Sequence, residues 1–367
     1  MDKDEQFQFI TYGARLKAEQ ISGLLAYLLL QNERERVTPL CIWGTHGIGK
    51  TQLVREFAEA NNCDFTYIAP AQFEEMGDLL GMPQIDARGK TTRFIPPEWV
   101  PQHEGPGILL IDDVNRADDR ILRGIMQLLQ NYELVSWSLP KKWMIVLTAN
   151  PDGGDYSVTT LDDAMITRML HVTMEFEIKA WARWAERSGV DSRGINFVLT
   201  YPEIVQGVLT TPRTLVQFFA AISSVENLSA ELPLVRILAE GSLDREAAIA
   251  FTNFVNLELG QLITPEEILN ASDFEGPRQR IEQLVNGSTK RLDILSILMT
   301  RLTNYLIFQE GTLNDAQFEH LSHFIQLPFI PNDLRLSMAQ DLMKSEREDL
   351  KKLYTIPEVG KLLLEKM

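Results

Sequence analysis

Short apolar runs and helical patterns alternate along the first half of the chain. Runs rich in β-branched and aromatic residues predict strands at 37–43, 64–69, 107–112, 143–149 and 169–174. Because amphipathic helical patterns separate these runs, we expect five parallel strands that are buried on both faces. The predicted fold class is therefore α/β.

Helical spacing dominates both ends of the chain. Residues 16–36 carry apolar positions at helical spacing and finish in a charged stretch, so 1–36 is predicted to be an N-terminal helical segment. After residue 176 the helical pattern continues to Met367, and 291–308 is strongly apolar on one face. The second half is therefore predicted to be α-helical.

Two segments interrupt the alternation of strands and helices. Residues 71–106, between the second and third predicted strands, are rich in Gly and Pro and must contain turns. Residues 131–141 mix polar and apolar side chains at short period and contain Pro140, which suits a hairpin before the fourth strand.

Composition narrows the possible partners and compartments. At 367 residues the chain is long enough for two or three domains. Its net charge of -16 disfavours a nucleic-acid partner, because an acidic surface repels phosphates. Two cysteines without metal-ligand spacing, no signal-peptide pattern and no apolar run of about 20 residues predict a cytoplasmic protein that does not insert into a membrane.

A phosphate-binding loop follows the first predicted strand. The sequence GTHGIGKT matches the pattern G-x-x-x-x-G-K-[ST] and opens a helix, so backbone N–H groups are expected to surround phosphates. Lys50 is expected to reach the β and γ phosphates, and Thr51 to bind Mg²⁺ through its hydroxyl. The predicted nucleotide-binding residues here are Gly44, Thr45, His46, Gly47, Ile48, Gly49, Lys50, Thr51 and Gln52.

Two carboxylates end the third predicted strand, in the sequence ILLIDD at 108–113. A nucleotide site needs one carboxylate at the Mg²⁺ and another that polarises the attacking water. We expect Asp112 to take the first role, as a metal ligand, and Asp113 the second, as a catalytic residue.

The order of these motifs resembles that of the AAA+ ATPases, from about residue 37 to 225. The sequence DDVNRA at 112–117 is similar to the acidic motif of the MoxR family, and 71–106 and 131–141 resemble that family's helix-2 insertion and pre-sensor hairpin. The resemblance implies an α/β P-loop core at 37–178, a small helical lid at 179–228 and a C-terminal helical domain at 229–367. ATP and Mg²⁺ are the implied cofactors.

The resemblance also assigns roles to three later residues. Asn150, after the fourth predicted strand, matches the first sensor, which orients the attacking water together with Asp113. Arg168 matches the arginine finger that reaches a neighbouring subunit's γ phosphate, and Arg213 matches the second sensor on the lid. Arg116 is left open between an inter-subunit contact and an ion pair with Asp118 or Asp119.

The resemblance implies a ring, expected to be a hexamer, with a chaperone-like role. Such a ring remodels or activates a protein client, often with a von Willebrand factor A domain protein or an associated metallopeptidase. One position departs from the family pattern, because Asp113 stands where glutamate is usual and is shorter by one methylene. Since small misplacements of a catalytic group cost about 100-fold in rate, the shorter acid leaves open whether hydrolysis is slow.

Two alternative functions compete with this hypothesis. A nucleic-acid motor requires a basic pore, whereas the insertion is mainly acidic. Its charged residues are Arg88, Lys90 and Arg93 against Glu74, Glu75, Asp78, Asp86, Glu98 and Glu104. The other alternative is a nucleotide-dependent scaffold that hydrolyses ATP weakly, which the shorter Asp113 would suit.

Overall fold

The computed structural model describes residues 12–85, 89–151, 159–256, 262–285, 291–308, 312–343, 347–355 and 359–360. The chain divides into two compact units, residues 1–176 and 177–367. The first unit is α/β and the second is helical, as the sequence predicts.

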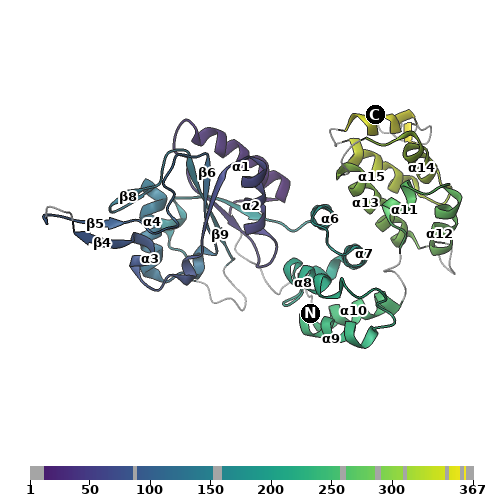
Figure 1. Ribbon diagram of the computed structural model, residues 1–367, viewed down its shortest axis with the longest axis horizontal. Coiled ribbons are helices and arrows are strands. Elements are labelled where there is room, and N and C mark those ends of the chain that lie inside the picture. The colour runs from purple at the N-terminus through teal and green to yellow at the C-terminus, as the bar shows by residue number, and fades with distance from the viewer. Residues whose placement is uncertain are drawn as a thin grey trace. The chain divides into compact units, whose positions relative to one another are not determined.

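A six-stranded parallel sheet forms the centre of the first unit (Figure 1). Its order is β1-β10-β2-β9-β6-β3. The bounds are Ala14–Leu16 (β1), Leu170–Met174 (β10), Leu40–Trp43 (β2), Trp143–Ala149 (β9), Gly107–Ile111 (β6) and Asp64–Ile68 (β3). All five predicted strands are present, and the predicted α/β class is confirmed.

The sixth strand corrects the prediction for the N-terminal segment. Within 12–36, the helix α1 covers Ala18–Asn32, but the preceding residues form β1 and pair with β10, with Ala14 opposite Val172. A strand of three residues is too short to show a period of two, and pairing with β10 creates it. Residues 1–11 lie outside the described residues.

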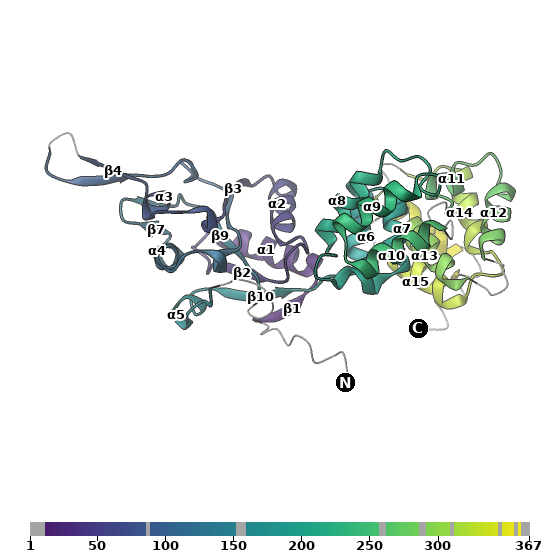
Figure 2. The ribbon, with the colours of Figure 1, turned by 90° about the horizontal axis from the view of Figure 1, so that it is seen from below.

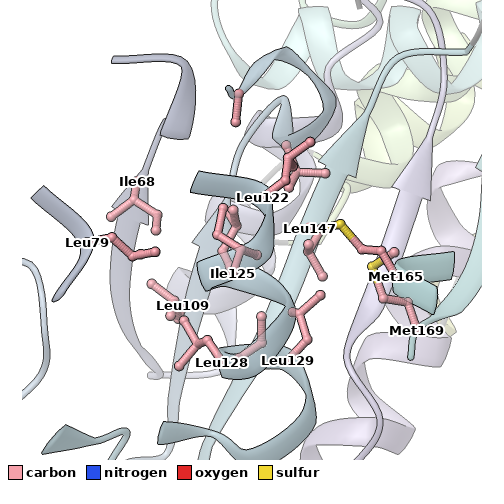
Figure 3. Packing of buried hydrophobic residues seen from close by; sticks show 14 of the residues in the cluster. Ile68, Leu79, Leu109, Leu122, Ile125, Leu128, Leu129, Leu147, Met165 and Met169 are labelled. Atoms are coloured by element: carbon pink, nitrogen blue, oxygen red, sulfur yellow. The ribbon is translucent and has the colours of Figure 1, made fainter. Parts of the chain in front are cut away.

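Helices cover both faces of the sheet (Figure 2). On β6, Ile108 and Leu110 pack with α1 and with α2, which spans Lys50–Ala60. Leu109 and Ile111 point the other way, toward α3 (Met76–Leu80) and α4 (Asp119–Asn131). Figure 3 shows the side chains of α4 packed on this second face. Two buried faces explain why β2 and β6 are apolar at every position.

Two small hairpins interrupt the helical layer, in the segments that the sequence marks as irregular. Strands β4 (Met82–Ile85) and β5 (Thr92–Ile95) pair antiparallel and project from the sheet in Figures 1 and 2. The second hairpin joins β7 (Glu133–Leu134) and β8 (Trp137–Ser138). The short segments of this unit are Pro70–Gln72 (η2), Val114–Arg116 (η3) and Asp163–Ile166 (α5).

The second unit consists of helices in its described residues. Their bounds are Ile178–Arg187 (α6), Ser192–Thr200 (α7), Pro202–Gln206 (η4), Pro212–Ile222 (α8), Leu232–Ser242 (α9), Arg245–Asn256 (α10), Pro265–Leu269 (α11), Glu275–Val285 (α12), Leu292–Phe308 (α13), Asp315–Ile325 (α14), Asn332–Met343 (α15) and Glu348–Thr355 (η6). The further division into a lid and a C-terminal domain stays a prediction. No helix among the described residues combines the length and apolarity needed to cross a membrane.

Candidate functional site

The predicted site residues of the first unit lie mainly at one edge of the sheet. Parallel pairing places Trp43 opposite Ala149, and Ile111 opposite Leu147. The carboxyl ends of β2, β6 and β9 therefore meet, and the loop 44–51, the two acids and Asn150 follow these ends directly. Ligands of open α/β sheets bind at this edge.

Glycines shape the loop between β2 and α2. Gly47 and Gly49 have φ angles of 74° and 98°, in the left-handed region that favours glycine. A Cβ atom on Gly44 would lie 2.6 Å from Cδ1 of Ile48. The loop is thus compact, and its end is the N-terminus of an eleven-residue helix, where a helix dipole favours an anion.

Lys50 is the first residue of α2, at the end of this loop, and its side chain is buried, with 6% of the residue exposed. Its ammonium donates hydrogen bonds to the carbonyl oxygens of Gly44 (2.7 Å) and Thr45 (3.1 Å) and to Oδ1 of Asn150 (3.2 Å). A buried charge is stable only when polar groups surround it, and these oxygens meet that requirement. The positive charge is therefore fixed close to the loop.

Asp112 accepts hydrogen bonds from three hydroxyl groups. Thr51 Oγ1 (2.7 Å) and Thr148 Oγ1 (2.6 Å) donate to its Oδ1, and the Tyr67 hydroxyl donates to its Oδ2 at 3.3 Å. Partial burial and the neighbouring Asp112 carboxylate raise the pKa of Tyr67, so this hydroxyl stays protonated as a donor. Carboxylate and hydroxyl oxygens are hard ligands, so Thr51 and Asp112 fit the predicted Mg²⁺.

Asp113 adopts a left-handed backbone conformation, with φ 48° and ψ 47°. Its Oδ1 accepts a hydrogen bond from Nδ2 of Asn150 (2.9 Å), and its Oδ2 lies 3.4 Å from Nε of Arg116. Arg116 thus pairs with Asp113 rather than with Asp118, which pairs with Arg120. The candidate catalytic acid is held between an amide and a guanidinium group.

The side chain of Asn150 connects the two halves of the site. It is fully buried, with Oδ1 toward Lys50 and Nδ2 toward Asp113. Its backbone is fixed by Asn115, whose Oδ1 accepts from the Asn150 N–H (3.1 Å) and whose Nδ2 donates to the Asn150 carbonyl (2.7 Å). The amide therefore has a single orientation that satisfies both neighbours.

Sequence reasoning missed three residues of this network: Tyr67, Asn115 and Thr148. Thr148 was detectable, because it is a polar residue inside an apolar strand and lies two residues before Asn150, on the same face. Its hydroxyl donates to Asp112 and accepts the N–H of Asp113 (2.8 Å). Nothing in the sequence marks Tyr67 or Asn115 as neighbours of these side chains.

We expect Thr148→Val to lower the rate of ATP hydrolysis about 10-fold and to raise the Mg²⁺ concentration needed for half-maximal rate. The change nearly preserves volume but leaves the partly buried N–H of Asp113 without its acceptor, a loss worth about 1–3 kcal/mol. Mg²⁺ titrations of steady-state phosphate release measure both effects. Thr148→Ser should keep near-normal values, and Thr66→Val on β3 serves as a matched control. Wild-type Mg²⁺ dependence in Thr148→Val would contradict this role.

The remaining predicted residues lie outside this network. Arg168 follows α5 and donates hydrogen bonds to Oε1 of Gln130 (3.1 Å) and to the carbonyl of Ala164. Gln52 is bonded to Glu56 on the exposed face of α2. Arg213 is exposed in the first turn of α8, in the second unit, so its contact with the nucleotide stays a prediction.

Comparisons with known proteins agree with this architecture. Residues 39–169 match the family model of the AAA domain, dynein-related subfamily. The match and the sheet topology identify an α/β AAA+ P-loop fold. A comparison with curated proteins found no significant match.

Structures of RuvB from Thermotoga maritima are also similar to the chain. One RuvB variant is 14% identical, covers 85% of this chain and 97% of its own, and has a TM-score of 0.40. The structure described as the RuvB Holliday junction branch migration motor is 13% identical, covers 83% and 94%, and has a TM-score of 0.37. At these scores nothing about function follows from either structure.

Proposed function

Because residues 39–169 form an AAA+ domain, we propose that the chain hydrolyses ATP as a subunit of a ring that remodels or activates a protein client. The observation that carries the proposal is the side chain of Asn150, which joins the Lys50 ammonium to the Asp113 carboxylate. A positive charge, an orienting amide and a carboxylate are thus joined by two hydrogen bonds, and phosphoryl transfer to water requires these three groups.

Each residue of the site has a task in this reaction. The loop 44–51 and Lys50 bind the phosphates and neutralise charge on them. Thr51 and Asp112 hold Mg²⁺, which supplies further charge neutralisation when it is bound. Asp113 accepts a proton from the attacking water, and Asn150 orients that water relative to Asp113. Arg116 faces the same carboxylate and limits its freedom.

We propose that Arg168 and Arg213 contact the nucleotide from outside the phosphate-binding loop. Arg168 is the arginine finger that one subunit presents to the γ phosphate of its neighbour, so the site is complete only in a ring, expected to be a hexamer. Arg213 contacts the nucleotide from the lid. Both assignments rest on the match of their sequence positions to the AAA+ pattern.

The insertion supports a protein rather than a nucleic acid as the client. An open groove of about 500 Å³ lies at the base of the β4–β5 hairpin, and its lining includes Phe73, Met82, Ile95 and Trp99. Met82 is 71% exposed, and exposed apolar side chains beside a groove are typical of protein contacts. The motif DDVNRA further supports the MoxR group and a von Willebrand factor A domain partner.

The proposal is tested by steady-state ATP hydrolysis against protein concentration, with mass measured with and without ATP. We expect cooperative activation, assembly with ATP, and stimulation by an unfolded protein but not by double-stranded DNA. Stimulation by DNA alone would favour the motor alternative. ATP binding without hydrolysis at any concentration would favour the scaffold and contradict the proposal.

A further inference from the structure

The imidazole of His171 is bonded through both nitrogens. The indole N–H of Trp43 donates to Nδ1 of His171 at 2.9 Å, and Nε2 lies 2.8 Å from the carbonyl oxygen of Ile166. An indole N–H is a donor only and a carbonyl oxygen is an acceptor only. The ring must therefore carry its proton on Nε2, so one neutral tautomer satisfies both partners.

These two partners belong to the two functional regions of the first unit. Trp43 is the last residue of β2 and directly precedes Gly44 of the phosphate-binding loop. Ile166 is the last residue of α5, two positions before Arg168. Two hydrogen bonds of one side chain thus join the start of the loop to the segment that carries the proposed finger.

Packing limits the movement of this link. Tyr12 stacks on Trp43 with ring centroids 4.1 Å apart, and its ring lies 5.8 Å from that of His171. Met165 lies in α5 and Met169 follows Arg168. Both are buried in the same cluster as Trp43, and Figure 3 shows both beside Leu147. A shift of Trp43 is therefore passed to the α5 segment rather than absorbed by empty space.

The other hydrogen bonds of this segment do not reach β2. In the described part of the chain, the hydrogen bonds of residues 163–168 join residues of the 162–169 segment to one another. Two bonds leave the segment: Arg168 donates to Gln130 on α4, and the Ile166 carbonyl is bonded to His171. Arg168 is thus oriented by Gln130 on α4 and by the Ala164 carbonyl of α5, whereas His171 supplies the described side-chain link between α5 and β2.

We propose that His171 is a positioning residue that couples the phosphate-binding loop of a subunit to the arginine finger that this subunit presents to its neighbour. Nucleotide bound at the loop moves or stiffens Trp43, and His171 passes this change to the backbone at Ile166 and so to Arg168. Since a displacement of about 1 Å in a catalytic group costs about 100-fold in rate, a small shift is sufficient. The inference rests on the proposed role of Arg168 in trans.

Mixed rings separate this role from the subunit's own catalysis. Arg168→Ala subunits keep their site but lack the finger, and Asp113→Asn subunits bind ATP at the loop and keep the finger but lack the catalytic carboxylate. If the finger acts in trans, mixing the two inactive proteins restores hydrolysis. We expect a donor with Asp113→Asn and His171→Phe to restore at least about 10-fold less, because phenylalanine fills the space without either hydrogen bond.

Two further donors complete the comparison. His171→Gln can place an amide N–H near the position of Nε2, so this variant in the Asp113→Asn donor should restore hydrolysis substantially. His103→Phe is the matched control, because His103 lies at the other end of the sheet beside Asp64. As a readout apart from activity, ¹⁵N NMR of labelled histidine should include the signal of a ring protonated on Nε2 that is assigned to His171 by its absence in His171→Phe.

The outcomes distinguish the two proposals. Full restoration by the His171→Phe donor, or a His171 protonated on Nδ1, would overturn the coupling role while the finger in trans stands. Failure of the first mixture would remove the role of Arg168, and the coupling with it. If the His171→Phe donor does not assemble, Trp43→Phe replaces it, because it keeps a smaller aromatic ring at this position and removes the indole N–H; its full restoration would equally overturn the role.

Discussion

Lys50→Ala is expected to weaken ATP binding about 100-fold and to abolish measurable hydrolysis. Lys50 presents a buried ammonium that Gly44, Thr45 and Asn150 hold next to the loop, so its orientation needs little rearrangement when phosphates bind. A hydrogen bond to a charged group contributes about 1.5–3 kcal/mol, and two such contacts to phosphate correspond to about 100-fold in affinity. Calorimetric titration with an ATP analogue and Mg²⁺ measures this loss directly.

The control for Lys50→Ala must separate loss of the phosphate contact from loss of structure. Lys141→Ala removes an exposed lysine before β9, at the opposite edge of the sheet, and should leave binding unchanged. The removed ammonium also leaves Oδ1 of Asn150 without its described donor, so thermal denaturation should show a modest loss of stability. Unchanged nucleotide affinity in a folded Lys50→Ala protein would contradict the site.

The sheet could be predicted because each of its central strands is visible in the sequence as a short apolar run. The central strands β2, β6 and β9 are covered on both faces, so their residues are apolar apart from Thr148, and helical segments between the strands require parallel pairing. The strand β1 could not be predicted, since its three residues are defined by their partner β10. Pairing between segments that lie far apart in the sequence leaves no periodic signal in a stretch of that length.

The motif residues of the site could be predicted from the sequence, but the hydrogen bonds and the ion pair that join them could not. Strand ends that meet at one edge bring the loop, Asp112 and Asn150 together, and sequence order alone identifies them. The pairing of Arg116 with Asp113 depends on the left-handed backbone at Asp113, which the residue type permits but does not require. The Asn115 amide pair likewise depends on the path of η3, which no motif specifies.

The shorter acid at position 113 also has a geometric consequence. Aspartate reaches the Asn150 amide at 2.9 Å while its backbone is in the left-handed conformation. The Thr148 hydroxyl accepts the N–H of Asp113. The left-handed conformation and the Thr148 acceptor therefore act together on the short carboxylate, and a partly buried hydrogen bond offsets the strain of the backbone.

Arg168→Ala is expected to lower the rate of ATP hydrolysis about 1,000-fold while leaving nucleotide affinity unchanged. A finger that neutralises charge in the transition state is worth about 10³–10⁵ in rate. Within its own subunit Arg168 is bonded to Gln130 and Ala164 in the described structure, so its removal should not disturb the loop that binds phosphates. Steady-state phosphate release and calorimetric titration with an ATP analogue measure the two quantities separately.

The matched control is Arg123→Ala, because Arg123 is an exposed arginine of α4 whose Nε donates to the carbonyl of Asp119. It should hydrolyse ATP normally, which excludes a general effect of surface charge. A parallel loss of affinity and rate in Arg168→Ala would place the guanidinium at its own subunit's nucleotide. A wild-type rate would instead remove Arg168 from catalysis, and the site would then be complete without a neighbour, so activity should no longer depend on protein concentration.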